Sequence, residues 1–154
     1  MKVVYSCYWG SYLAVVAASL HLGGLSSNMY TTYDNLSLPL FNSISNEQMG
    51  ELFFMGKDDK RREIYIIGAK NAGQVMKKTF NGISEVFGLG RDTIQYIDLN
   101  GISNFYIFIG GLLIKKCGMA KLGMRFILIG IKKSIQQLNG ITHNVKSKLD
   151  KVMV

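Results

Sequence analysis

Short runs of Val, Ile, Phe and Tyr recur along this chain and predict the strands of a sheet. Five such runs occur, at residues Lys2 to Tyr8, Leu52 to Met55, Ile64 to Ile67, Thr93 to Leu99 and Arg125 to Ile129. The fifth run is apolar at nearly every position, which is typical of a strand that is covered on both faces. The pattern therefore predicts a sheet of about five strands.

Between these runs, apolar residues recur every three or four positions, which is the spacing of one face of a helix. This spacing predicts helices over Ser11 to Leu22, ended by Gly23 and Gly24, and over Asn71 to Phe87, with Asn71 as the cap. A closing amphipathic helix is predicted from Ile135 to Val152.

Two segments fit a single pattern less well. Residues Ser103 to Cys117 favour a strand locally, but their length and a cap at Ser103 favour a buried helix, which we predict. Residues Leu25 to Met49 are rich in Ser, Asn, Thr and Tyr, and Thr32 could cap a short helix that ends at Pro39.

Alternation of strands with helices predicts the α/β class. We expect a three-layer domain over residues 1–154, with a mostly parallel sheet and helices on both faces. The charged link Lys57 to Arg62 joins two β-favouring runs, which indicates one antiparallel hairpin near a sheet edge.

The composition fits a cytoplasmic protein with one folded core. The chain has 154 residues, is 48% apolar and contains one proline. Cys7 and Cys117 match no disulfide or zinc pattern, so we expect reduced thiols. The apolar stretch from Phe105 to Ile114 is too short to span a membrane. The N-terminal residues resemble a signal peptide, but polar residues interrupt their apolar run, so we expect no signal peptide.

The charge is unevenly distributed. Up to Gly56 one base faces three acids, which gives a charge of −2, whereas the remaining residues carry +10. Six bases form the densest cluster: Lys115, Lys116, Lys121, Arg125, Lys132 and Lys133. This pattern fits either a solvated basic face or a surface for an acidic partner. Nucleic acid is not expected, because the nearby aromatic residues occupy runs that resemble a core.

Ligands of open α/β sheets bind outside the carboxyl ends of the strands, which directs attention to two loops. The first is the turn Cys7 to Ser11, where backbone amides at the start of a helix could bind an anion. Trp9 and Gly10 lie in this turn, which matches no nucleotide-binding motif. The second follows Leu99, next to Asp98 and Asn100.

Other residues offer less specific chemistry. Cys7 at the end of a strand fits either a nucleophile or a small buried packing residue, so catalysis stays open. His21 and His143 are too few for a zinc site built on histidine, and we expect His21 to pack at the end of the first helix. Lys70 and the pair Arg91-Asp92 could flank a pocket or be solvated.

The chain resembles a family of spore-forming Gram-positive bacteria known as domain of unknown function 3189. The resemblance covers nearly the whole chain and lies in Val3-Val4-Tyr5-Ser6-Cys7-Tyr8, Gly10, Val15-Val16-Ala17-Ala18, His21-Leu22-Gly23, Phe54-Met55-Gly56, Glu85-Val86-Phe87-Gly88 and Gly110-Gly111. It implies an α/β cytoplasmic protein with no assigned activity.

Two functions follow as expectations. The first is binding of a small anionic ligand, such as a nucleotide or phosphate ester, at the first strand-to-helix turn, with Cys7, Trp9, Gly10, Ser11, Asp98 and Asn100 as candidate site residues. The alternative is a protein-interaction or regulatory module with a basic C-terminal surface. The sequence indicates no particular cofactor and no metal.

Overall fold

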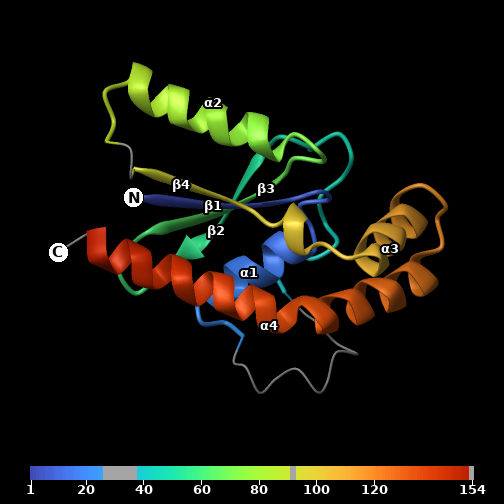
Figure 1. Ribbon diagram of the computed structural model, residues 1–154. Coiled ribbons are helices and arrows are strands. Elements are labelled where there is room, and N and C mark those ends of the chain that lie inside the picture. Colours follow the sequence, from blue (N-terminus) through green and yellow to red (C-terminus); the bar gives the residue numbers. More distant parts are fainter. Residues whose placement is uncertain (26–37, 91–92, 153–154) are drawn as a thin grey trace.

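In the computed structural model, which describes residues 1–25, 38–90 and 93–152, one sheet of four strands forms the centre of the chain (Figure 1). The strands are β1 (Lys2–Cys7), β2 (Leu52–Lys57), β3 (Glu63–Gly68) and β4 (Ile94–Asp98). They lie in the order β2-β3-β1-β4, and β1 is parallel to both of its neighbours. β2 is antiparallel to β3, so the predicted hairpin at a sheet edge is confirmed.

Helices connect and follow these strands. The described residues form α1 (Leu13–His21), α2 (Gly73–Val86), α3 (Phe105–Lys115), α4 (Ala120–Val152) and the short 3₁₀ helix η3 (Asn100–Ile102). α1 and α2 confirm the helices that the apolar spacing predicted over Ser11 to Leu22 and Asn71 to Phe87, and α3 confirms the helix predicted for Ser103 to Cys117. The predicted cap at Thr32 lies outside the described residues.

The predicted fifth strand is wrong. Residues 125–129 lie inside α4, a single helix of 33 residues that also contains the predicted closing helix. Ile127 and Ile131 are buried, whereas Ile129 is 46% exposed, so burial follows a helical period through this run. The local preference of Ile and Phe for strands is overridden by packing against the rest of the molecule.

α4 packs closely against α3 from its first turn onward. A Cβ atom at Gly123 would lie 2.7 Å from the carbonyl oxygen of Gly110, and a Cβ at Gly130 would lie 2.4 Å from Cγ1 of Ile107. Glycine at these positions lets the two helices approach more closely than larger residues allow. Gly123 meets Gly110 and the later Gly130 meets the earlier Ile107, so the two helices are antiparallel.

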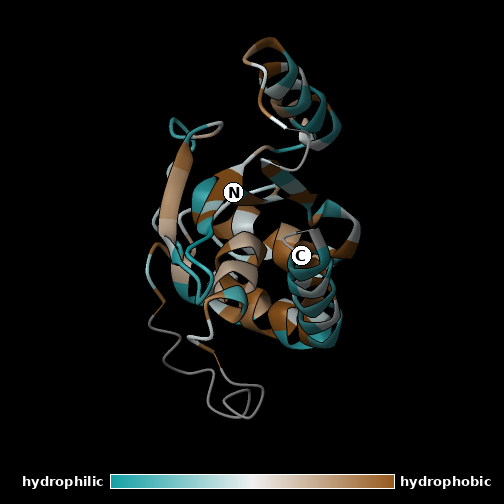
Figure 2. Ribbon diagram, turned by 90° about the vertical axis from the view of Figure 1, so that its left-hand side faces the viewer, coloured by the Kyte–Doolittle hydropathy of each residue, from teal (hydrophilic) through white to brown (hydrophobic). Residues whose placement is uncertain are grey.

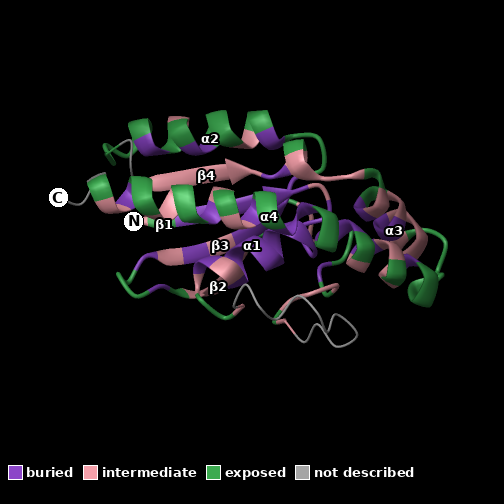
Figure 3. Ribbon diagram, turned by 60° about the horizontal axis from the view of Figure 1, so that its bottom comes forward, coloured by how far each residue is buried: buried purple, intermediate pink, exposed green. Residues whose placement is uncertain are grey.

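Helices lie against both faces of the sheet. The main core joins β1 residues such as Tyr5 to α1 and α4, through residues such as Leu13 and Ile131. On the opposite face, Val4 and Phe80 belong to a smaller cluster that joins β1 to α2. Figure 3 shows α1 buried along most of its length, while α2 and α4 are exposed on their outer sides, and Figure 2 shows that α4 is hydrophilic there.

Two predicted caps are wrong. α2 begins after Ala72, and no side chain caps it, so Asn71 does not have the expected role. α3 begins after Asn104, whose Oδ1 accepts a hydrogen bond from the Ile107 N–H at 3.2 Å. The cap is therefore the residue directly after the predicted Ser103, and serine and asparagine are both preferred at this position.

Among the described residues, no helix is both long enough and apolar enough to cross a membrane.

Candidate functional site

The first strand-to-helix turn is closed rather than open to solvent. Trp9, Gly10 and Ser11 are all buried. Gly10 has a φ of +73°, and a Cβ atom there would lie 2.8 Å from the Cα of Gly68 in β3. Only glycine fits at this position, because another residue would be strained and would collide with the neighbouring strand.

A segment that follows the undescribed residues covers the turn. The Ser11 hydroxyl accepts a hydrogen bond from the Ile44 N–H at 3.2 Å, and the Asn42 N–H donates to the Ser11 carbonyl oxygen at 3.2 Å. Lys115 of α3 donates from its ammonium group to the carbonyl oxygen of Ile44. The loop around Ile44 is therefore held against the turn from both sides.

The thiol of Cys7 is buried at the turn whose amides we expected to face an external anion. Burial raises the pKa of this thiol. Hydrogen bonds from four backbone N–H groups oppose the rise without cancelling it, those of Ala14, Gly10, Tyr12 and Trp9. A nucleophilic cysteine needs the opposite shift, so the geometry favours the packing role of Cys7.

The indole of Trp9 fills the space between the turn and α3. Its ring lies 4.8 Å from that of Tyr8 and 6.4 Å from that of Phe108, measured between centroids. A Cβ atom at Gly111 would lie 2.1 Å from Nε1 of Trp9, so α3 approaches the indole directly. The Trp9 side chain thus packs in the main core.

Beside this closed turn lies a pocket of about 400 Å³ at the carboxyl edge of the sheet. It is lined by residues that follow β1, β3 and β4 and by the start of α3: Tyr8, Asn71, Asn100, Ser103, Asn104, Phe105 and Phe108. Parallel strands end at a common edge, so their loops meet there. The two predicted loops are therefore brought together, although none of the predicted first-turn residues Cys7, Trp9, Gly10 and Ser11 lines the pocket.

Asn100 and Asp98 occupy different places. Asn100 lines the pocket, and its side-chain Nδ2 donates to the carbonyl oxygen of Lys70 at 2.9 Å. Asp98 lies outside it and accepts the Asn100 N–H at Oδ1, 3.0 Å away. Its other oxygen would be 2.0 Å from a Cβ at Gly73, so the Asp98 carboxylate packs against the start of α2.

The pocket is rich in aromatic rings and side-chain amides. Phe105 is 70% exposed and Phe108 is 40% exposed, which corrects the expectation that these rings belong to the core. The rings of Tyr8 and Phe108 meet edge to face, with centroids 5.4 Å apart. An exposed aromatic surface beside amide donors and acceptors suits a planar polar ring.

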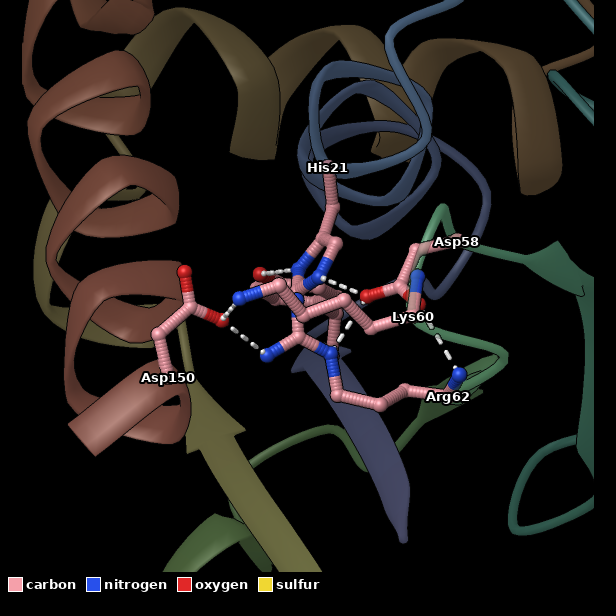
Figure 4. Close-up of polar contacts among 6 residues, drawn as sticks. His21, Asp58, Lys60, Arg62 and Asp150 are labelled. Atoms are coloured by element: carbon pink, nitrogen blue, oxygen red, sulfur yellow. Dashed lines mark hydrogen bonds and ion pairs between the residues drawn. The ribbon is translucent and has the colours of Figure 1, made fainter. Parts of the chain in front are cut away.

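A buried polar network at the other end of the sheet had no signal in the sequence (Figure 4). The Tyr5 hydroxyl lies 2.7 Å from Nδ1 of His21, and His21 Nε2 lies 3.3 Å from Asp58 Oδ2. Arg62 donates from Nε to Oδ2 of Asp58 at 2.5 Å and from Nη1 to Oδ1 of Asp150 at 2.8 Å. The expectation that His21 packs at the end of the first helix is confirmed, since it is the last residue of α1.

The charge states in this network follow from burial and pairing. Burial lowers the pKa of His21, against the opposite effect of Asp58. Burial alone would raise the pKa of Asp58, but hydrogen bonds and charge from Arg62 bring it below its ordinary value. An ionised Asp58 can only accept, so Nε2 of a neutral His21 donates to it, and Tyr5 donates to Nδ1. The charged and polar groups of this network are paired with one another, so few of them are free to bind a substrate.

The basic cluster lies at the end of α3 and along the first half of α4. Its members are exposed except Lys115, which is half-buried beside the loop around Ile44. Lys133 lies over the ring of Tyr106, with its ammonium nitrogen 4.1 Å from the ring centroid. An acidic partner for this surface stays a prediction.

The remaining predicted groups contribute no further site. His143 is exposed on α4, and the pair 91–92 lies outside the described residues. Among the residues that the structure describes, no three His, Cys, Asp or Glu side chains gather as they do around a metal ion.

Comparison with known proteins identifies a family. Residues 2–147 match the model of a family described as a protein of unknown function (DUF3189), so the chain belongs to that family. Neither the curated proteins nor the solved structures contain a match to the chain.

Proposed function

We propose that this member of the DUF3189 family binds a small anionic ligand with a planar ring, such as a nucleotide, in the pocket at the carboxyl edge of the sheet. The observation that carries this function is the meeting of Tyr8, Asn71 and Asn100, which follow three adjacent parallel strands, around one opening. Open α/β sheets bind their ligands at such an edge.

The lining favours a ring. Phe105 and Phe108 expose aromatic surface beside Tyr8, and stacking on such a surface is worth about 1–3 kcal/mol for a nucleobase. The side chains of Asn71 and Asn100 offer amide donors and acceptors, which match the edge of a heterocycle. Ring recognition therefore needs no charge in the lining.

The anionic part of the ligand is assigned to Lys70. This residue is exposed, adjoins Asn71 in sequence and accepts a hydrogen bond from Asn100 at its carbonyl oxygen. The amides of the first turn are less suitable, because Trp9, Gly10 and Ser11 are buried. The net charge of +8 also favours anionic ligands in general.

Isothermal titration calorimetry against nucleotides and sugar phosphates tests this function. We expect at least one nucleotide to bind, with Asn100→Ala and Lys70→Ala each weakening the affinity by about ten-fold, the loss that one charged or well-placed hydrogen bond causes. Asn144→Ala and Lys78→Ala alter exposed residues outside the pocket and serve as matched controls.

Two results would contradict the proposed function. The first is no heat from any ligand at millimolar concentration. The second is binding that Asn100→Ala and Lys70→Ala leave unchanged, since the ligand would then occupy another part of the surface.

A further inference from the structure

β4 is an edge strand whose outer side has no partner strand among the described residues. Of the strands that the structure describes, it pairs with β1 alone, and Figures 1 and 3 show it between α2 and α4. The Leu99 N–H donates to the carbonyl oxygen of Ser6 at 2.8 Å, which fixes the residues that face β1. Because alternate residues of a strand direct their main-chain groups to opposite sides, those of Ile94, Tyr96 and Asp98 face the open edge.

A groove of about 480 Å³ runs along this edge. All five residues of β4 line it, with α2 and α4 as its two walls: Gln74, Lys77 and Asn81 on one side, and Val145, Lys148 and Leu149 on the other. Neighbouring strands lie about 4.8 Å apart, so a peptide in the groove could pair with β4 as a fifth strand.

The groove carries positive charge on both walls. Lys77 on α2 and Lys148 on α4 are exposed, and neither forms an ion pair with a residue that the structure describes. Asp98 is the one carboxylate in the described lining. It is already compensated by the N–H of Asn100 and by the start of α2, against which it packs. The uncompensated charge of the groove is therefore positive.

We propose that β4 binds an extended peptide segment of a partner protein that carries two adjacent acidic residues. Successive side chains of a strand point to opposite faces, so neighbouring acids would meet Lys77 on one wall and Lys148 on the other. Acids two positions apart would both face the same wall. The uneven charge along the sequence favours an acidic partner of this kind.

A second copy of this chain is a poorer occupant. Pairing of β4 with the β4 of a second copy would bring a second Lys77 and a second Lys148 close to the lysines that already line the groove. Like charges on neighbouring strands repel. The groove also shares no lining residue with the pocket at the carboxyl edge, so this interaction does not depend on ligand binding there.

Fluorescence anisotropy with labelled hexapeptides tests the proposal. The probe is Thr-Val-Glu-Glu-Val-Thr, and the comparison peptide is Thr-Glu-Val-Glu-Val-Thr, which has the same composition with the acids on one face. We expect the probe to bind at least about three-fold more tightly than the comparison peptide, because the probe can form ion pairs with both lysines and the comparison peptide with only one. Methylation of alternate backbone nitrogens of the probe should abolish binding in one of the two alternating sets and leave the other set intact.

Variants of the protein locate the peptide. Lys77→Glu and Lys148→Glu should each weaken binding by about ten-fold, because an attractive charge becomes repulsive. Lys78→Glu on α2 and Lys132→Glu on α4 change exposed lysines outside the groove and should have little effect. Thermal melting of each variant verifies that it is folded.

Several outcomes would overturn the proposal. They are no binding of the probe at millimolar concentration, equal affinity for the two peptides, binding that tolerates both methylation patterns, and equal effects of groove and control variants. A dimer in light scattering that the probe dissociates would assign the edge to a second copy instead.

Discussion

The hydroxyl oxygen of Tyr5 lies 2.7 Å from Nδ1 of His21, with both side chains fully buried. Tyr5 is the donor in this pair, because the other nitrogen of His21 donates to the carboxylate of Asp58. The folded protein therefore requires a neutral imidazole at this position. This requirement connects the stability of the fold to pH.

Stability should decrease as the pH falls below about 6.5. Burial lowers the pKa of His21, whereas the unfolded chain has the ordinary value of 6.5, so the unfolded chain binds a proton that the folded protein does not. Stability from this group is complete above pH 6.5 and is lost below it, at up to about 1.4 kcal/mol per pH unit. Urea unfolding between pH 8 and pH 5 measures the change.

Replacement of the two histidines isolates this effect. His21→Gln should reduce stability at neutral pH and flatten its pH dependence between 8 and 5. His143→Gln, at an exposed position on α4, should leave the wild-type dependence in place. Equal slopes for wild type and His21→Gln would show that another group is responsible.

Arg62→Met should destabilise the protein by about 3–5 kcal/mol. This change leaves the buried carboxylate of Asp58 without its cation, which costs far more than loss of a solvated ion pair. Asp150→Asn is the matched comparison, because the Asp150 side chain is 40% exposed, and its loss should cost about 1 kcal/mol or less. Urea unfolding that gives similar losses for the two variants would contradict this ranking.

Two glycines of α4 should respond in opposite directions to the same substitution. Gly123→Ala places a Cβ atom 2.6 Å from Cγ1 of Ile114 and should cost about 1–3 kcal/mol. Gly140→Ala meets nothing within 4 Å and should stabilise the helix by about 0.5–1 kcal/mol. Free energies of unfolding from urea titrations measure both effects, and a neutral Gly123→Ala would argue against the close crossing of α3 and α4.

The two cysteines should differ in reactivity. Cys117 is exposed, whereas Cys7 is buried and burial raises the pKa of its thiol. Ellman's reagent should therefore titrate one thiol in the folded protein and two in denaturant. The Cys117→Ser variant should show no reactive thiol until it unfolds. Rapid reaction of Cys7 in that folded variant would instead revive it as a candidate nucleophile.

Local sequence patterns were sufficient to predict elements that pack against segments close to them in sequence. The hairpin of β2 and β3 was readable because both strands and the turn lie within 17 residues. The run 125–129 was mistaken for a strand because Ile129, which is exposed, is apolar like the buried Ile127 and Ile131. Its apolar side chain hides the helical spacing of the buried residues. The correct signal was the buried spacing of three or four that continues from Gly123 into the second half of α4.

Sequence reasoning directed attention to the carboxyl edge of the sheet, where a pocket lies, and ligand binding there stays a prediction. Asn100 lines the pocket as its position after a strand indicated. Burial of Trp9 and Ser11 depends on Gly111 and on Ile44, which are far away in sequence. Sequence spacing carries no information on such distant contacts. The closure of the turn, which we expected to be open, could therefore not be predicted.

α4 has 33 residues, about 50 Å of helix at 1.5 Å per residue, and it connects both ends of the sheet. Gly123 packs against α3, and Asp150, near the other end of the same helix, binds Arg62 from the hairpin. A nascent chain on the ribosome thus has its sheet strands well before the residue that gives Arg62 its second carboxylate. Until residue 150 is synthesised, the Arg62 guanidinium of the emerging chain lacks the second of the two carboxylates that it binds among the described residues.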